Sequence, residues 1–164
     1  MNSEQLNIEF LRVKDAAYRY AVSLLHNPAE AEDLVQDLYE KLWRRRLLLR
    51  QSGFRSLVLT STRNMALDCL RERERRRLIT DIGEATGQGV ELKEPSDDVA
   101  IIKRIISSLP DREREVIHLR DVEAMEFTDI AEVVGSNVAA VRMAHSRARQ
   151  RVREEFSKIM NYGL

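Results

Sequence analysis

Hydrophobic residues recur at intervals of three and four along most of this chain, the spacing that places side chains on one face of an α-helix. The first stripe consists of Phe10, Val13, Ala17, Tyr20, Ala21, Leu24 and Leu25. It predicts a helix that ends near His26. Asn27 and Pro28 then suit the N-cap and first position of a second helix, because proline lacks the N–H that this position leaves unpaired. The apolar side of that second helix consists of Ala31, Leu34, Val35, Leu38 and Leu42.

A third helix is predicted after a break at Gln51, Ser52 and Gly53. Its apolar stripe consists of Phe54, Leu57, Val58, Ser61, Met65 and Cys69. It ends in the arginines Arg71, Arg73, Arg75, Arg76 and Arg77. Such a run is either a solvated helix end or a track along a nucleic-acid backbone, and the run alone does not decide between them.

The C-terminal part of the chain carries four further stripes. The first consists of Ile101, Ile102, Ile105, Ile106 and Leu109, and Pro110 ends it. We expect Asp111 to cap a short helix after it. The remaining inward positions are Val116, Ile117 and Leu119, then Ile130, Ala131, Val133 and Val134, then Val138, Val141, Ala148 and Val152. Gly135 suits the left-handed residue that closes one of these helices, and Asn137 suits the cap of the last.

Two short helices joined at Gly135, the second of them basic, are typical of a helix-turn-helix whose second helix enters the major groove. One exposed stripe on that helix consists of Arg142, Ser146, Arg149 and Arg153, with Arg147 and Arg151 in a row beside it. The candidates to reach base edges are Asn137, Ala140, Arg142, Met143 and Ser146. The later arginines are expected to reach phosphates, and a merely soluble surface is the alternative.

Charge divides the chain into three segments. Residues 1–78 carry 15 basic and 11 acidic side chains, residues 79–99 carry one basic and six acidic, and residues 100–164 carry 11 basic and 10 acidic. The middle segment also contains three glycines and a proline. We therefore predict an all-α protein with two small helical lobes, at 1–78 and 100–164, joined by a flexible acidic linker at 79–99.

Composition excludes several classes of protein. The 27 basic and 27 acidic side chains cancel, no apolar run is long enough to span a membrane, and the N-terminus lacks a secretory signal. The single cysteine excludes an internal disulfide framework or a cysteine-rich zinc site. The three histidines are scattered, and no P-loop or nucleophile motif is present. We therefore expect a cytoplasmic protein that is not an enzyme, with no catalytic residue, metal site or cofactor.

Three blocks of this sequence resemble the extracytoplasmic-function (group 4) sigma factors of bacterial RNA polymerase. Residues 31–43, from Ala31-Glu32-Asp33-Leu34 to Leu42-Trp43, are similar to the first block of sigma region 2. Residues 54–71, with Arg63-Asn64-Met65-Ala66-Leu67-Asp68 at their centre, are similar to the second. Residues 109–152 are similar to region 4. The blocks cover most of the chain in the family's order, so together they are far more specific than any one.

The resemblance implies roles for both lobes in directing polymerase to promoters. Region 2 would bind the clamp coiled coil of the polymerase β′ subunit through Asp33, Leu34, Gln36, Asp37 and Trp43. It would bind the melted −10 element through Phe54, Arg55, Arg63, Asn64 and Arg71. Asn64 is the candidate reader of an unstacked base, because its amide both donates and accepts hydrogen bonds.

Region 4 would read the −35 element and sit near the polymerase β flap through its acidic shoulder, residues 111–132, which carry eight acidic side chains and three arginines. The residues that the resemblance and the helix pattern assign to −35 DNA are Asn137, Arg142, Met143, Ser146, Arg147 and Arg149. The resemblance also implies an anti-sigma factor as a partner. It further implies that the active chain is a monomer and does not insert into a membrane.

Several positions depart from the family pattern. The family's tryptophan in the second block is replaced at or beside Leu57, and Ser61-Thr62 stand where Ile-Ala is usual. Met143 and Ala144 stand where small polar or basic residues are common, which indicates an unusual −35 sequence. His145 occupies an apolar-side position. We expect it to be half-buried with its hydrogen bonds satisfied, and a pH-sensitive role is the alternative.

Two other functions are consistent with the sequence. A stand-alone helix-turn-helix regulator with an N-terminal dimerisation lobe would bind duplex DNA without polymerase. A regulatory binding protein could keep the fold without supporting transcription. The sigma-factor interpretation differs from the stand-alone regulator in one prediction. It predicts weak binding to DNA by the free chain, because core polymerase must set the spacing of the two lobes.

Overall fold

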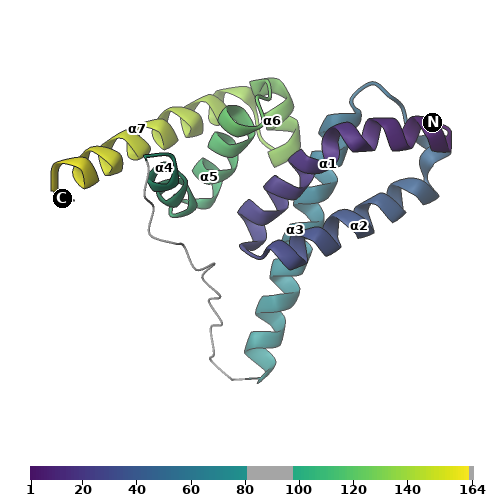
Figure 1. Cartoon of the computed structure of the whole chain (residues 1–164), viewed down its shortest axis with the longest axis horizontal. Helices are drawn as coiled ribbons and strands as arrows, with labels where there is room; N and C mark the ends of the chain where they lie inside the picture. The colour runs from purple at the N-terminus through teal and green to yellow at the C-terminus, as the bar shows by residue number, and fades with distance from the viewer. Residues whose placement is uncertain (81–97, 163–164) are drawn as a thin grey trace. The chain divides into compact units, whose positions relative to one another are not determined.

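The computed structural model describes residues 1–80 and 98–162, and every regular element in these residues is helical (Figure 1). The all-α prediction is therefore confirmed. The first of two compact units contains α1 (Ser3–Leu25), α2 (Pro28–Arg44), the 3₁₀ turn η1 (Arg46–Leu48) and α3 (Phe54–Thr80). The second contains α4 (Asp98–Ser107), α5 (Asp111–Ile117), the π-helical turn η2 (His118–Val122), α6 (Phe127–Val134) and α7 (Val138–Tyr162).

The junction between α1 and α2 follows the local signals in the sequence. His26 ends α1 in the left-handed conformation, with φ of 54°, and its N–H donates to the Val22 carbonyl at 2.8 Å. The Asn27 side chain then accepts a hydrogen bond from the Glu30 N–H at 3.0 Å, with Pro28 as the first helical residue. The predicted end of the first helix and start of the second are both confirmed.

The first unit is a bundle in which α1 packs against both α2 and α3. Its largest fully buried side chains are Leu6, Tyr20, Leu25, Leu38, Val58, Leu59 and Thr62. Burial of these apolar side chains is the main source of stability for the bundle, because neither disulfide nor metal site supplements it in the described residues.

The buried stripe of α3 differs from the prediction. It consists of Phe54, Val58, Leu59, Thr62 and Ala66. Leu57, 40% exposed, and Cys69, also exposed, were predicted to face inward. The prediction missed the true stripe because Thr62, a polar residue, occupies a core position. Its hydroxyl donates to the Val58 carbonyl at 2.8 Å, so the polar group is buried without losing its hydrogen bond.

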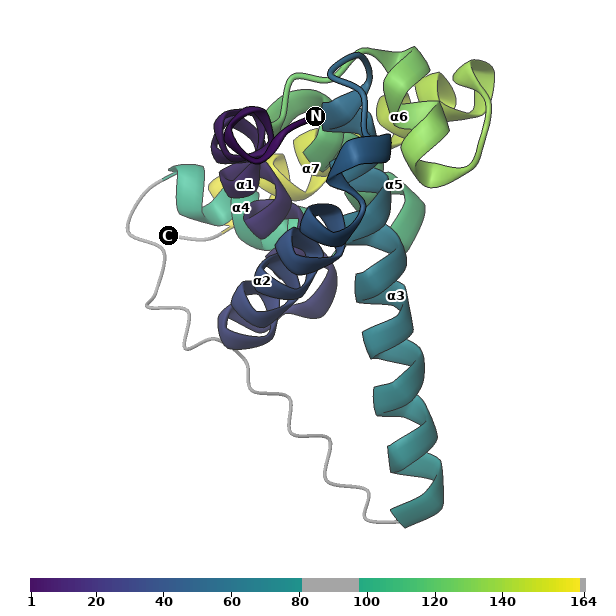
Figure 2. The same cartoon turned by 90° about the vertical axis from the view of Figure 1, so that its right-hand side faces the viewer.

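The C-terminal part of α3 projects beyond α1 and α2 (Figures 1 and 2). All residues from Arg73 to Thr80 are exposed. The acidic linker was predicted at 79–99, and its residues 81–97 lie outside the described residues. At the two ends of that range, Ile79 and Thr80 belong to α3, and Asp98 and Val99 belong to α4.

In the second unit, α7 packs against α4, α5 and α6. Val141, Ala144 and Ala148 are buried, with Ile130, Val133 and Val134 of α6 and Val116, Ile117 and Leu119 of α5 and η2 in the same core. The side chains that α7 buries are mostly small, so the helix axis lies close to its neighbours. The position of α7, and therefore of its outward face, is set by this packing.

Caps in the second unit confirm two predictions and correct a third. Gly135 closes α6 with φ of 66°, a backbone conformation that is sterically unfavourable for residues with a side chain. The Asn137 side chain accepts from the Ala140 N–H at 2.8 Å at the start of α7. Asp111 was predicted to cap α5, but Pro110 is the N-cap and Asp111 is the first helical residue. Its carboxylate instead pairs with Arg114 at 3.1 Å.

The π-helical turn η2 has no counterpart among the predicted elements. It ends beside Ala124, whose φ is 57°, and it encloses a buried pair in which His118 Nε2 lies 2.9 Å from Glu123 Oε2. These two side chains are 10% and 1% exposed. The turn is therefore held by a polar contact between residues five apart, which hydrophobic spacing does not reveal.

Replacement of a core leucine should destabilise the first unit much more than replacement of a surface leucine. Leu38 is 1% exposed and Leu47 is 79% exposed. We expect Leu38→Ala to lower the free energy of unfolding by about 2–5 kcal/mol, because it leaves a cavity. Urea denaturation followed by the fluorescence of Trp43, the single tryptophan, measures it. Equal midpoints for Leu38→Ala and the control Leu47→Ala would contradict this core.

Candidate nucleic-acid and protein interfaces

The residues predicted to bind protein on α2 divide into exposed and buried positions. Asp33, Gln36 and Asp37 are exposed on the side of the helix opposite the core. Leu34 is only 3% exposed and lies in the core, so it positions the helix rather than meeting a partner directly. Trp43 is 36% exposed, with the Arg46 guanidinium 4.5 Å from its ring centroid. One helix therefore presents two carboxylates, an amide and, at its end, an aromatic ring.

A groove of about 560 Å³ lies between α2 and α3. Its lining holds five carboxylates, those of Glu30, Asp33, Asp37, Asp68 and Glu72, and three cations, those of Lys41, Arg73 and Arg76. Cys69 also borders it, and partial burial together with the charge of Glu30 raises the pKa of the Cys69 thiol. A thiol held in its protonated form is a poor nucleophile, so Cys69 does not make the groove a reactive site.

The residues predicted to contact the −10 element do not all share one face of α3. Asn64 and Arg71 are seven residues apart, both exposed, and lie opposite the buried stripe. Arg55 is exposed in the first turn, and Arg63 is half-buried on the flank. Phe54 is 2% exposed and belongs to the core, so it cannot contact DNA directly in this structure. Its role is to anchor the start of α3.

The arginine run at the end of α3 is neutralised within the first unit. The pairs, all with carboxylates, are Arg71 with Asp68, Arg73 with Glu30, Arg75 and Arg76 with Glu72, and Arg77 with Glu74. The hydrogen bond from Arg75 lowers the pKa of the Glu72 carboxyl to about 2. These pairs are exposed and exchangeable, but each phosphate that enters must compete with a carboxylate already present.

Arginines without an ion pair among the described residues of the first unit lie elsewhere. Arg44, Arg45 and Arg50 flank η1 and are exposed. Beside them, Leu47 and Leu48 are 79% and 77% exposed. The helix pattern alone does not single out these three arginines, because Glu40 lies four residues before Arg44, at a spacing that allows an ion pair.

The arginines of α7 fall into two groups. Arg149 and Arg151 point to opposite flanks and pair with acids of the neighbouring elements. Arg142, Arg147 and Arg153 are exposed and have no ion pair in the described part of the chain. Met143 and Ser146, also predicted to contact DNA, are exposed between them. Asn137 is exposed too, but its side-chain oxygen is occupied by the helix cap.

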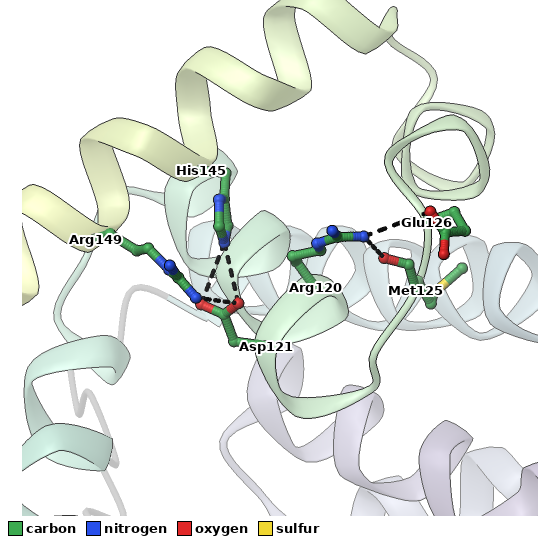
Figure 3. A network of polar contacts seen from close by, with 6 residues as sticks. All are labelled: Arg120, Asp121, Met125, Glu126, His145 and Arg149. Atoms are coloured by element: carbon green, nitrogen blue, oxygen red, sulfur yellow. Dashed lines mark hydrogen bonds and ion pairs between the residues drawn. The ribbon is translucent and has the colours of Figure 1, made fainter.

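Asp121 connects α7 to η2 (Figure 3). Its carboxylate accepts from Arg149 Nε at 3.2 Å and Nη2 at 3.1 Å, and His145 Nε2 lies 3.1 Å from the same group. Partial burial raises the pKa of the Asp121 carboxyl, but the hydrogen bonds and charges of Arg149 and His145 outweigh it and hold that pKa below its ordinary value of 3.8. Arg149 was predicted to contact DNA, and in this structure its guanidinium pairs with Asp121.

His145 and Arg142 also meet the ring of Phe127, the first residue of α6. The His145 ring packs edge-on at 5.4 Å between centroids, and the Arg142 guanidinium lies 5.6 Å from the Phe127 centroid. Arg120 lies closer, at 4.2 Å, and donates to the Met125 carbonyl at 2.8 Å. His145 is half-buried and hydrogen-bonded, as predicted. The ring thereby restrains Arg142 on the flank of α7.

The predicted acidic shoulder at 111–132 is partly internal. Glu113, Glu115 and Glu123 are buried, and Glu113 Oε2 lies 2.8 Å from Arg151 Nε. Glu113 thereby ties α7 to α5, and burial of the three carboxylates leaves fewer acids on the surface than the sequence indicated. In the described residues, no group of acidic, histidine or cysteine side chains could hold a metal ion, and no helix is long and apolar enough to cross a membrane.

Comparisons with protein families identify both units. A family model described as Sigma-70 region 2 matches residues 10–76, and one described as Sigma-70, region 4 matches residues 100–152. The first match spans most of the helices α1 to α3, and the second runs from α4 into α7. The two regions therefore occur in order, each on its own helical unit.

Individual relatives agree with these matches. The chain is 30% identical to a probable RNA polymerase sigma factor, RfaY, of Xanthomonas campestris pv. campestris, over 82% of this chain and 36% of the relative. It is 27% identical to the ECF RNA polymerase sigma factor SigE of Mycolicibacterium smegmatis, over 88% of this chain and 58% of the relative. The chain thus spans between a third and three fifths of the length of these curated relatives.

A solved structure has the same fold over nearly its full length. The sigma factor RpoE of Bartonella quintana, crystallised with the anti-sigma factor NepR, superposes with a TM-score of 0.77 and 26% identity. The match covers 94% of this chain and 98% of the other.

The Asp121 pair should stabilise α7 in a pH-dependent way. Because the folded-state pKa is lowered, the stabilisation is present above pH 3.8 and is lost as the pH falls through the folded-state value. We expect Asp121→Asn to cost about 0.2–1 kcal/mol near neutral pH, the range for partly exposed pairs. Amide hydrogen exchange in α7 measures it, with Glu132→Gln on α6 as the control. A loss of protection that is equal at all pH values would contradict the ionic contribution.

Proposed function

Because the chain belongs to the sigma-70 family, in its extracytoplasmic-function group, we propose that it is a transcription initiation factor that binds core RNA polymerase and directs it to specific promoters. The observation that carries the proposal is the presence of both family regions, in order, each on a separate helical unit with its own exposed polar face. The chain would supply binding and orientation, and the polymerase would supply the chemistry.

The first unit, corresponding to the predicted lobe at 1–78, would bind the clamp coiled coil of the β′ subunit through the exposed face of α2. Asp33, Gln36 and Asp37 support this role because they are exposed together, and none of the three has a competing ion pair in the described residues. Carboxylates opposite arginines of a partner would fix orientation and speed association. Leu34 would act by packing α2 in place, and Trp43 would lie at the edge of the contact.

The same unit would bind the melted −10 element on α3. The exposed amide of Asn64 is suited to reading the edge of an unstacked base, and Arg55 and Arg63 precede it on the same helix. Arg71 would reach a phosphate only by leaving Asp68. The unpaired Arg44, Arg45 and Arg50 add positive charge that the melted strand could follow.

The second unit, corresponding to the predicted lobe at 100–164, would read the −35 element with α7. The exposed Arg142, Met143, Ser146 and Arg147 support this role. Asn137 would act chiefly as the cap that sets where α7 begins. Arg149 would act by holding α7 to η2 rather than by contacting a base. The remaining exposed acids of residues 111–132 would face the polymerase β flap.

The chain would work in the cytoplasm, as a monomer when active, with an anti-sigma factor as its regulator. Regulation by an anti-sigma factor is supported by RpoE, which was crystallised with such a factor. A stand-alone helix-turn-helix regulator is not favoured, because such a protein has no need of region 2. A protein that kept the fold and lost transcription would bind polymerase without producing transcripts.

Loss of the polar face of α2 should weaken binding to core polymerase. We expect the double variant Asp33→Ala/Gln36→Ala to bind about tenfold more weakly, because complementary charges and hydrogen bonds at the interface are removed while the buried Leu34 stays in place. Titration of fluorescently labelled chain with core polymerase measures the affinity. The matched control is Glu4→Ala/Asp15→Ala on α1, also exposed. Similar losses in the two double variants would argue against α2 as the contact.

The two groups of arginines on α7 should respond differently to removal. Arg147→Ala should weaken binding of the holoenzyme to a −35 element by about 1–3 kcal/mol, because an unpaired arginine at a base edge is lost. Arg149→Ala should cost less binding, since its charge already faces Asp121. Binding to promoters with and without the −35 element, over a range of salt, separates the two effects. A larger loss for Arg149→Ala would overturn this assignment.

A further inference from the structure

The outward face of α7 changes chemistry along its length. Its residues lie opposite the buried Val141, Ala144 and Ala148, and all of them are exposed. In order, they are Ala139, Ala140, Met143, Ser146, Arg147 and Gln150. The first three are apolar and the last three are polar. A helix that entered the major groove with this face would therefore present methyl groups first and hydrogen-bonding groups one turn later.

Met143 is the largest side chain in the apolar part of this face. It is 56% exposed, on a helix that buries mainly small side chains. The adjacent Arg142 does not cover it, since its guanidinium lies over Phe127. The adjacent Ala139 and Ala140 are short, so the helix can approach the floor of a groove closely at this point. Met143 is thus a flexible, exposed apolar side chain in the middle of the outward face of α7.

The major groove offers one apolar group for such a side chain, the C5-methyl of thymine. Cytosine, adenine and guanine present only donors, acceptors and ring edges there. We propose that Met143 reads a thymine methyl group in the −35 element, with Ser146 and Arg147 meeting the polar edges of the next base pairs. The inference rests on the proposed function, because it requires α7 to lie in the major groove.

Replacement of thymine by deoxyuridine tests this contact, because it removes the methyl group and leaves base pairing unchanged. Holoenzyme formed from the full chain and core polymerase is first used to select −35 sequences from promoters randomised in that segment. Each thymine of the selected element is then replaced singly by deoxyuridine. We expect one replacement to weaken binding of the wild-type holoenzyme about fourfold, the effect of one buried methyl group.

Variants of the chain assign that effect to a side chain. Met143→Ala should bind the thymine and deoxyuridine promoters equally, whereas Met143→Leu should retain the difference because it restores an apolar side chain. Met160→Ala, at the other end of α7 and 52% exposed, is the matched control and should behave as wild type. Because Met143 is on the surface, its replacement should leave thermal unfolding unchanged.

The outcomes separate this inference from the proposed function. If the holoenzyme selects a −35 element in which no deoxyuridine replacement matters, the thymine contact is wrong while the function stands. If the discrimination persists in Met143→Ala, another residue reads the methyl group and the assignment to Met143 is wrong. If no −35 sequence is enriched, the proposed role of region 4 fails, and the thymine contact with it.

Discussion

Pairing between arginines and carboxylates inside each unit is the constraint on which the surfaces of this protein depend. The chain has 27 basic and 27 acidic side chains, and much of that balance is realised in local contacts. The end of α3 is neutralised by acids one turn away and by Glu30. Arg149 and Arg151 fasten α7 to η2 and α5. In the described residues, Arg44, Arg45 and Arg50 around η1 and Arg142, Arg147 and Arg153 on α7 are exposed and have no ion pair, so their charge is available to a phosphate or a base.

The paired arginines and the apolar core of the second unit act together. Val141, Ala144 and Ala148 bring α7 close to its neighbours, and Asp121 and Glu113 hold its two flanks. With one face buried and both flanks fixed, only one face of α7 can meet a ligand. A recognition helix held in this way presents its side chains without first having to be ordered, which favours specific over nonspecific binding.

Helix caps and apolar spacing predicted most of the helices. The features that the sequence did not predict depend on contacts that apolar spacing cannot reveal. Asn27, Pro28, Gly135 and Asn137 each act within their own turn, so sequence alone located these helix ends correctly. The core position of Thr62 depends on a hydrogen bond that apolar spacing cannot detect. Phe54 and Arg149 were predicted from residue type and position, and the pattern could not show that Phe54 is buried or that Arg149 pairs with Asp121. Which arginines are free is decided in three dimensions.

Run-off transcription with purified chain, core polymerase and promoters selected by the holoenzyme shows whether the surfaces on α2 and α7 allow this chain to bring core polymerase to a promoter. We expect transcripts of one defined start that require the chain, the core enzyme and both promoter elements. Binding of the selected duplex by the chain alone as tightly as by the holoenzyme, with no chain-dependent transcript, would mean that the chain acts without polymerase.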